Sequence, residues 1–446
     1  MEVKLVFLPV RMLRKADRLA RAFGVFERPL RGEELVRVAT KRTGLTDFGD
    51  RSFEEPLEVL LRDYESAADL SLFGRIAARW DMLRFLSNLL RLREQELRCP
   101  EILRQPIVKP IFITGMPRSG SSFLHNLLAQ DSSIFTPLCW ETIHPCRLPG
   151  EAEGNSGRRQ KMADRTLAGF NWVAPELGAL HPLTAHSTQE CSEISAHVFR
   201  SRRFETTHRL PDYRTWLEHA GDLSAYRFHK RFLQHLQHRR GPGRWIVKCP
   251  EHTFSLDSIR AVYPDASFVF MHRDPFEVLR SLAKLTEVLR RPFTRSIDRF
   301  QIGRQVSESW ARGVDLMVEA DAKSRGTGHQ ILNIQHRHLI QQPLATAMAL
   351  YKHFGIPTSE EATGRLERFI AGRRNGGYGR NRYRPAEFGL DPQTVASRFR
   401  NYAAHFAIGG ESGVNGLDER RKALIPGLAP PSTLNQLGNV RSAKAC

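Results

Sequence analysis

Two glycines, two serines and an arginine in one short stretch have the types and spacing of a phosphate-binding loop. Four residues separate Gly115 from Gly120, with Arg118 inside the loop and Ser121 and Ser122 directly after it. Such a loop points backbone N–H groups and a helix N-terminus at one anion. The glycine spacing is that of a nucleotide-binding P-loop, but Ser121 stands where a lysine would reach the β- and γ-phosphates. The sequence therefore favours a donor with a shorter phosphate chain than a nucleoside triphosphate.

The residues on either side predict the two elements that hold this loop. Residues 111–113 are an apolar run typical of a buried strand. Apolar residues at helical spacing follow the loop, namely Phe123, Leu124, Leu127 and Leu128. A glycine-serine turn without a chemical role is the competing interpretation, and the order strand, loop, helix argues against it.

A second strand-loop-helix unit lies in residues 267–281 and carries a cation and a hydroxyl. The pattern predicts a strand that ends at His272 and a helix with Pro275 in its first turn. Arg273 and Ser281 are eight residues apart in this unit.

Together these two motifs resemble those of sulfotransferases that use 3′-phosphoadenosine 5′-phosphosulfate (PAPS). Residues 117–122, Pro-Arg-Ser-Gly-Ser-Ser, resemble the 5′-phosphosulfate loop of that family. Arg273 and Ser281 match the pair that holds the 3′-phosphate there. The resemblance implies that the donor is bound by Arg118, Ser119, Gly120, Ser121, Ser122, Arg273 and Ser281. PAPS is then the co-substrate, and no metal is expected because side chains supply the cations.

A lysine follows a further predicted strand. Residues 245–248 form an apolar run that ends in Lys248. Sulfuryl transfer places negative charge on equatorial oxygens and on the leaving phosphate, as phosphoryl transfer does. Lys248 and Arg118 are therefore predicted to stabilise that charge.

Four residues are candidates for the base that accepts the acceptor's proton: Glu141, Glu190, His144 and His252. Glu141 is preferred by resemblance, because tyrosylprotein-type sulfotransferases carry a general-base glutamate shortly after the same loop and helix. In the cytosolic branch the base is a histidine two residues after the strand lysine, and Pro250 occupies that position here.

Residues 181–193 gather two histidines and two glutamates. His186, Glu190 and Glu193 on one helix face would suit a metal. A helix that begins near Ser187, with acids in its first turns, explains the same residues through capping and the helix dipole and is preferred.

Composition limits the class of protein. The chain has 446 residues, 41% of them hydrophobic, which suffices for a sizeable core in one large domain or two smaller ones. The net charge of +19 fits an anionic donor and an anionic acceptor or surface. Nucleic acid is the rival partner, but the charge is spread along the chain and no nucleic-acid-binding motif organises it. No run of 18 apolar residues occurs, so a cytoplasmic protein is expected.

Three regions are predicted: a helical region over 1–105, a sulfotransferase-like α/β domain over 106–410 and a flexible tail over 411–446. The first includes a basic amphipathic helix over 13–23, which would lie on an anionic membrane or dock on its own domain. Helices are predicted over 54–71, 76–98, 223–239 and 343–354, a strand over 331–334, and loops over 150–165 and 373–384. The arginine- and glycine-rich second loop is either solvated or closes over the nucleotide.

The predicted fold is a three-layer α/β domain of the P-loop type, with helices on both faces of a parallel sheet. The predicted reaction is in-line transfer of a sulfuryl group from PAPS to a hydroxyl or amine. A P-loop kinase, which would need Mg²⁺ and a triphosphate, and a non-catalytic nucleotide-binding protein are the alternatives. The acceptor remains open between a small molecule, a lipid and a glycan, and the sequence does not specify an oligomeric state.

Overall fold

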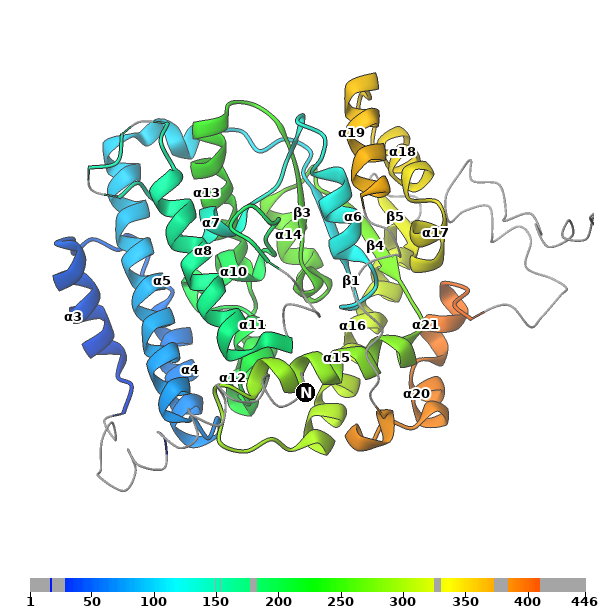
Figure 1. Ribbon diagram of the computed structural model, residues 1–446, viewed down its shortest axis with the longest axis horizontal. Coiled ribbons are helices and arrows are strands. Elements are labelled where there is room, and N and C mark those ends of the chain that lie inside the picture. The colour runs from blue at the N-terminus through cyan, green and yellow to red at the C-terminus, as the bar shows by residue number, and fades with distance from the viewer. Residues whose placement is uncertain are drawn as a thin grey trace, which may run out of the picture.

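A computed structural model describes residues 17, 29–148, 150–152, 154–176, 183–324, 330–372 and 384–409. These residues contain a five-stranded sheet in the order β2-β3-β1-β4-β5, with each neighbouring pair parallel (Figure 1). The strands are β1 (Ile111–Gly115), β2 (Ile134–Phe135), β3 (Arg244–Lys248), β4 (Ser267–His272) and β5 (Ile331–Gln335). The four predicted strands are confirmed. The two-residue β2 had no readable signal.

Helices cover both faces of the sheet. Ile111 and Ile113 face one hydrophobic cluster and Phe112 faces another, because alternate residues of a strand point to opposite sides. The first cluster includes residues of α6 (Ser121–Leu128), α17 (His336–Gln341), α18 (Pro343–His353) and α19 (Glu360–Ala371). The second includes residues of α13 (Leu223–Arg240), α14 (Leu256–Val262) and α16 (Arg299–Ser324). The predicted three-layer α/β fold is therefore confirmed.

The N-terminal helices extend the second cluster. They are α3 (Gly32–Thr43), α4 (Glu54–Ser66) and α5 (Leu72–Arg98), and they lie together at one side of the molecule (Figure 1). Leu35, Leu60 and Leu86 of these helices belong to the same hydrophobic cluster as Phe112. Residues of the helical region and of the α/β region thus belong to one hydrophobic cluster.

The remaining helices connect these layers. They are η1 (Pro100–Arg104), α7 (Cys139–Ile143), α8 (Gly157–Val173), α10 (Ser192–Ser195), η2 (Ala196–Val198), α11 (Arg203–Thr207), α12 (Pro211–Ala220), η3 (Pro250–Phe254), α15 (Pro275–Arg290), η4 (Pro385–Phe388), α20 (Pro392–Arg398) and α21 (Arg400–His405).

The loop predicted over 150–165 is wrong from residue 157 onward, where α8 begins. The polar composition misled the prediction because tertiary contacts decide this segment. Buried Arg159 donates from Nε to Glu151 at 3.1 Å, and its guanidinium lies 4.8 Å from the centre of the Trp140 ring.

The helix predicted near Ser187 is also wrong. The Ser187 hydroxyl accepts a hydrogen bond from the Thr184 backbone at 2.9 Å, which stabilises a turn. Thr188 then forms an isolated antiparallel bridge with Leu138. The helix begins only at Ser192, because the preceding residues pair with the loop before α7.

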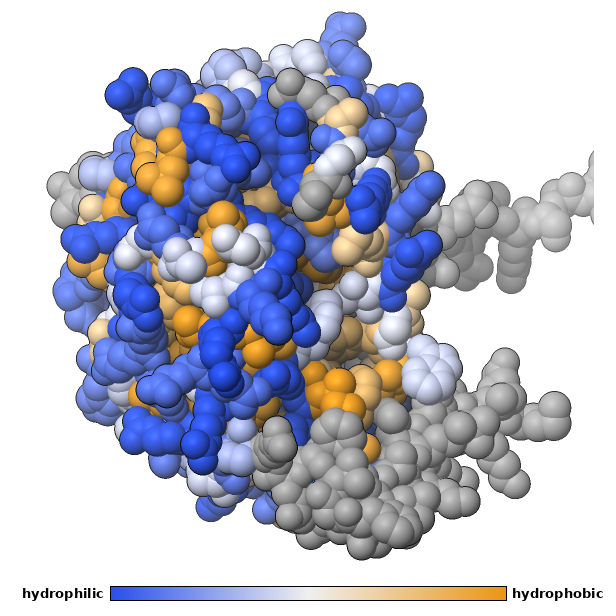
Figure 2. Space-filling model, turned by 90° about the vertical axis from the view of Figure 1, so that its left-hand side faces the viewer, coloured by the Kyte–Doolittle hydropathy of each residue, from blue (hydrophilic) through white to orange (hydrophobic). Residues whose placement is uncertain are grey.

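Three predicted segments lie outside the described residues: the basic helix over 13–23 except Asp17, the loop over 373–383, and the tail over 411–446. Among the described helices, none combines the length and the apolar character that a bilayer span requires. Hydrophilic residues cover most of the face on the side of α3–α5, with apolar residues in scattered patches (Figure 2).

Four charged side chains, hereafter the ion ring, join α5 to α10 and α11. Arg84 binds Asp81 at 2.8 Å and Glu193 at 2.6 Å. Arg203 binds the same two carboxylates at 2.7 and 2.9 Å. Burial alone would raise the pKa of Asp81, but the two arginines hold it below its usual value. The ion ring thus anchors the N-terminal helices to the segment that carries Glu193.

Asp81→Asn is expected to lower the free energy of unfolding by at most about 3–5 kcal/mol, because two partly buried arginines lose a shared partner. Urea unfolding at neutral pH measures this loss. The matched control is Glu54→Gln, which breaks an exposed pair with Arg51 and should cost less than about 1 kcal/mol. If both variants lose the same small amount, the ion ring contributes no more than a surface pair.

Candidate active site

The loop between β1 and α6 is built around two glycines in left-handed conformations. Gly115 has φ 129°, and a Cβ there would lie 2.4 Å from the Met271 carbonyl oxygen. Gly120 has φ 90°, and a Cβ there would lie 3.0 Å from the His336 ring. Gly120 precedes Ser121 and caps α6 with no side-chain hydrogen bond. The first N–H groups of α6 therefore keep their capacity to bind an anion.

Arg118 joins this loop to the second predicted motif. Its Nε donates to the Ser281 hydroxyl at 3.2 Å, and Arg273 donates from Nη1 to the Arg118 carbonyl at 2.7 Å. Arg118 itself has φ 65°, a left-handed conformation that is uncommon for a residue with a side chain. Three predicted donor-binding residues from two distant motifs thus meet at one point.

Lys248 lies at the carboxyl end of β3, beside the loop between β1 and α6. This loop, residues 116–120, is called the donor loop below, after its predicted role. Its side chain is 3% exposed, and its Nζ donates to the Ser122 hydroxyl at 2.9 Å and forms an ion pair with Glu190. Because β1 and β3 are neighbours with Ile113 opposite Lys248, the parallel register brings the lysine to the edge where the loop begins. Lys248 therefore connects Ser122 with Glu190.

A cavity of about 890 Å³ extends from the donor loop. Arg118, Ser121, Arg273 and Ser281 line one end of it. Most of the lining surface is apolar and includes Leu167, Phe170, Leu282, Leu285, Leu289 and Trp310, and the four residues of the ion ring line the cavity as well. The cavity lies outside the carboxyl ends of the strands, where parallel α/β sheets bind their ligands. It has room for a donor at one end and an acceptor at the other.

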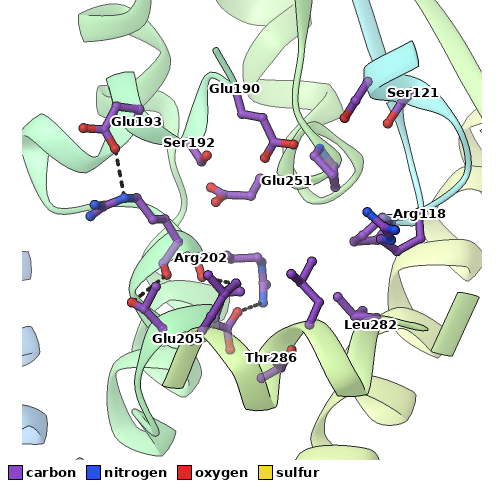
Figure 3. Close-up of a pocket in the computed structure, with 18 of the residues that line it drawn as sticks. Arg118, Ser121, Glu190, Ser192, Glu193, Arg202, Glu205, Glu251, Leu282 and Thr286 are labelled. Atoms are coloured by element: carbon purple, nitrogen blue, oxygen red, sulfur yellow. Dashed lines mark hydrogen bonds and ion pairs between the residues drawn. The ribbon is translucent and has the colours of Figure 1, made fainter. Parts of the chain in front are cut away.

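Two glutamates point into the cavity near the donor end (Figure 3). Glu190 is paired with Lys248. Glu251 accepts from the Ser201 hydroxyl at 3.0 and 3.1 Å, and burial raises the pKa of its carboxyl to about 7. A pKa near neutrality suits a proton-transferring group. Sequence reasoning missed Glu251, although it lies only three residues after the strand lysine, directly after Pro250.

Glu141, the preferred base, has a different environment. Its side chain accepts from the Leu138 backbone at 3.0 Å, pairs with Arg240 and is not among the residues that line the cavity. The residue is 4% exposed. A glutamate three residues after a helix cap has capping-box spacing, so this local role was readable. We therefore replace Glu141 by Glu190 as the candidate base.

The remaining predicted residues occupy other positions. His252 is buried against Phe112, where its Nδ1 shares a 2.6 Å hydrogen bond with the Tyr226 hydroxyl. His144 and Ser119 do not line the cavity either, and the Ser119 side chain is fully buried. Burial lowers the pKa of both His144 and His252, so each is held neutral away from the donor loop.

The metal interpretation of residues 181–193 is disfavoured by the ion pairs. Glu190 is bound to Lys248, and Glu193 to Arg84 and Arg203. Among the described residues, no group of three histidines, cysteines, aspartates or glutamates could hold a metal ion. The carboxylates of this segment are neutralised by arginine and lysine.

Comparison with known proteins agrees with the geometry. Residues 110–360, more than half of the chain, match the Sulfotransferase family. Two relatives, the omega-hydroxy-beta-dihydromenaquinone-9 sulfotransferases Stf3 of Mycobacterium bovis and Mycobacterium tuberculosis, are each 24% identical over 283 residues. That match covers 59% of this chain and 66% of each relative, just under two thirds of their length.

Solved structures extend the similarity to the fold of nearly the whole described chain. Sulfotransferase STF1 from Mycobacterium tuberculosis is 28% identical, with a TM-score of 0.73 over 83% of this chain and 98% of its own. Sulfotransferase STF9 from Mycobacterium avium is 24% identical, with a TM-score of 0.75 over 86% and 98%. The similarity in fold therefore extends beyond residues 110–360, which match the family.

Proposed function

Because this chain belongs to the sulfotransferase family, we propose that it transfers a sulfuryl group from PAPS to a hydroxyl or amine of its acceptor. The observation that carries the proposal is the junction of Arg118, Arg273 and Ser281 at one end of the cavity. In this proposal a loop for the 5′-phosphate lies beside a second cluster of side chains that would bind phosphate. PAPS carries one phosphate at the 3′ position of its ribose and one at the 5′ position, so it requires both groups of side chains.

The residues present fit such a donor. The N-terminus of α6 would hold the 5′-phosphosulfate together with Ser121 and Ser122, and Arg273 and Ser281 would hold the 3′-phosphate. The missing P-loop lysine disfavours the kinase alternative, because nothing in that position reaches a γ-phosphate. PAPS supplies the activated sulfuryl group, and the chain supplies charge and orientation.

The transfer breaks the sulfur–oxygen bond to the 5′-phosphate and forms one to the acceptor oxygen. Lys248 and Arg118 stabilise the negative charge on the sulfuryl oxygens and on the phosphate that leaves. Glu190 accepts the proton of the attacking hydroxyl, because its carboxylate lies at the cavity wall beside Lys248. The ion pair with Lys248 orients that carboxylate.

A small molecule or a lipid is the proposed acceptor. The Stf3 relatives are named for a sulfotransferase reaction on omega-hydroxy-beta-dihydromenaquinone-9. The apolar part of the cavity supports a comparably apolar acceptor here.

Thermal unfolding with 3′-phosphoadenosine 5′-phosphate (PAP) tests the donor site. PAP at a hundredfold excess over its dissociation constant should stabilise the wild type by about 2.7 kcal/mol without Mg²⁺. Arg273→Ala should lose most of this stabilisation, because a charge-assisted contact to the 3′-phosphate is removed.

Arg365→Ala is the matched control, since this arginine pairs with Glu361 on α19 and does not line the cavity. It should retain the full response to PAP. Stabilisation by Mg²⁺·ATP but not by PAP would contradict the proposal and favour a kinase.

A further inference from the structure

Helix α15 lines the cavity from the donor end to the far end. Ser281 belongs to the donor site, and Leu282, Leu285 and Leu289 follow along the cavity wall. Arg290 is the last residue of the helix and also lines the cavity. The nine residue-to-residue steps from Ser281 to Arg290 correspond to about 13–14 Å along the helix axis. The helix therefore presents a hydroxyl, an apolar stretch and a cation in that order.

Arg290 has an unusual environment among the arginines of the cavity. It is 3% exposed, and its Nη2 donates to the backbone carbonyl of Glu205 and, at 2.9 Å, to the Gln305 side chain. Its Nε is buried without a hydrogen-bond partner. Within the described residues, no carboxylate lies within the 4.0 Å of an ion pair with its guanidinium.

The neighbouring arginines are neutralised. Arg84 and Arg203 belong to the ion ring, and Arg202 pairs with Glu205 at 2.9 Å. Glu205, whose charge favours the ionised form of Arg290, is thus already paired with Arg202. Burial lowers the pKa of Arg290 to about 10, so the guanidinium is still charged at neutral pH. A buried cation without a counterion is costly, and an anion delivered by a ligand would remove that cost.

We propose that Arg290 binds an anionic group at the far end of the acceptor. The acceptor is then an elongated apolar alcohol that carries its reactive hydroxyl at one end and a carboxylate at the other. The leucines of α15 contact the chain between the two ends, and Leu167 and Phe170 of α8 line the same stretch. This inference rests on the proposed function, because it takes Ser281 and Lys248 as the donor end.

The axial rise along α15 gives the scale on which the probe is chosen. An extended chain advances about 1.2 Å per bond, so 13–14 Å correspond to about 11 bonds. The matched pair of probes is 10-hydroxydecanoate and 1,10-decanediol, which differ only in the anionic end group. Initial rates of sulfation with PAPS, and calorimetric binding to the PAP-saturated protein, are measured for both.

The wild type is expected to prefer the hydroxy acid by about 10- to 100-fold in kcat/KM, the range for a hydrogen bond to a charged group. The preference should appear in KM, because Arg290 is remote from the reacting sulfur. Arg290→Gln should erase the difference between the two probes, and Arg290→Lys should keep part of it because the charge remains. Arg365→Gln, which changes an arginine outside the cavity, should keep the whole preference.

An equal or better rate with the diol in the wild type would overturn the inference, and this comparison requires no variant to fold. A preference that survives in Arg290→Gln would overturn it as well. If the protein binds PAP but neither binds nor sulfates either probe, this acceptor class is wrong and the donor half of the proposed function stands. If PAP itself does not bind, the proposed function fails first and the inference fails with it.

Discussion

Glu190→Gln is expected to lower kcat by about 10²–10⁴-fold, the usual contribution of a general base. The amide keeps the size of the side chain but cannot accept the proton of the attacking hydroxyl. PAP binding should change little, because the donor contacts come from the loop and from Arg273. Rapid-quench measurement of a single turnover isolates this step from product release.

Glu141→Gln is the matched control for this prediction. Its carboxylate caps α7 and pairs with Arg240, so the variant should lose stability and retain kcat at a temperature where it is folded. A large loss of kcat in Glu141→Gln with a normal rate in Glu190→Gln would return the base to Glu141.

Glu251→Gln tests whether Glu251, the other glutamate near the donor loop, is the base instead of Glu190. If Glu251 were the base, the rate would rise with pH through about 7, where burial places its pKa, and that rise would vanish in the variant. Because Glu190 is the proposed base, we expect Glu251→Gln to retain kcat and the pH profile of the wild type.

The protein is expected to unfold in mild acid, between about pH 5 and 6. Burial lowers the pKa of four histidines to about 3, namely His125, His197, His208 and His229. In the unfolded chain the same side chains titrate near 6.5. The folded protein therefore holds these histidines in the neutral form. Their contribution to the free energy of unfolding is fully present above about pH 6.5 and is lost as the pH falls below that value.

The size of this loss follows from the shifts. At one pH unit below 6.5, each histidine lowers the free energy of unfolding by about 1.4 kcal/mol. Four histidines lower it by about 5–6 kcal/mol, which is comparable with the whole stability of a typical domain. Glu251 has the opposite sign, because its raised pKa adds stability as the pH falls through about 7. One such carboxyl offsets only part of the histidine term.

Urea midpoints between neutral pH and about pH 5 measure the effect. His229→Gln should shift the acid transition to lower pH, since one buried titrating ring is removed. The control is His219→Gln, which changes an exposed histidine on α12 and should leave the transition in place. A constant urea midpoint across this range would contradict the prediction.

The candidate donor site was largely readable from the sequence because its signals are local. An apolar strand, a loop with two spaced glycines and an amphipathic helix are contiguous in residues 111–128, and Arg273 and Ser281 belong to one strand-helix unit. Each unit folds from interactions between near neighbours. Parallel pairing of β1 with β4 then brings both units to the same edge of the sheet.

The identity of the candidate base depended on tertiary structure. Glu141 and Glu190 both follow the donor loop in loop-rich segments, and nothing local says which carboxylate faces the cavity. The structure separates them because Arg240 of α13 binds Glu141 outside the cavity, whereas Lys248 of β3 binds Glu190 at its wall.

The partners of the ion ring and of Arg290 also depended on tertiary structure. The ion ring and the environment of Arg290 combine residues from segments far apart in the chain, including α5, α11, α15 and α16. A sequence reveals periodicity and motif spacing, which local geometry fixes, and here it determined the family, the layers and the donor loop. Only the packing of distant segments decides which charges find partners and which carboxylate or guanidinium faces the cavity, because those partners are neighbours in space and not in sequence.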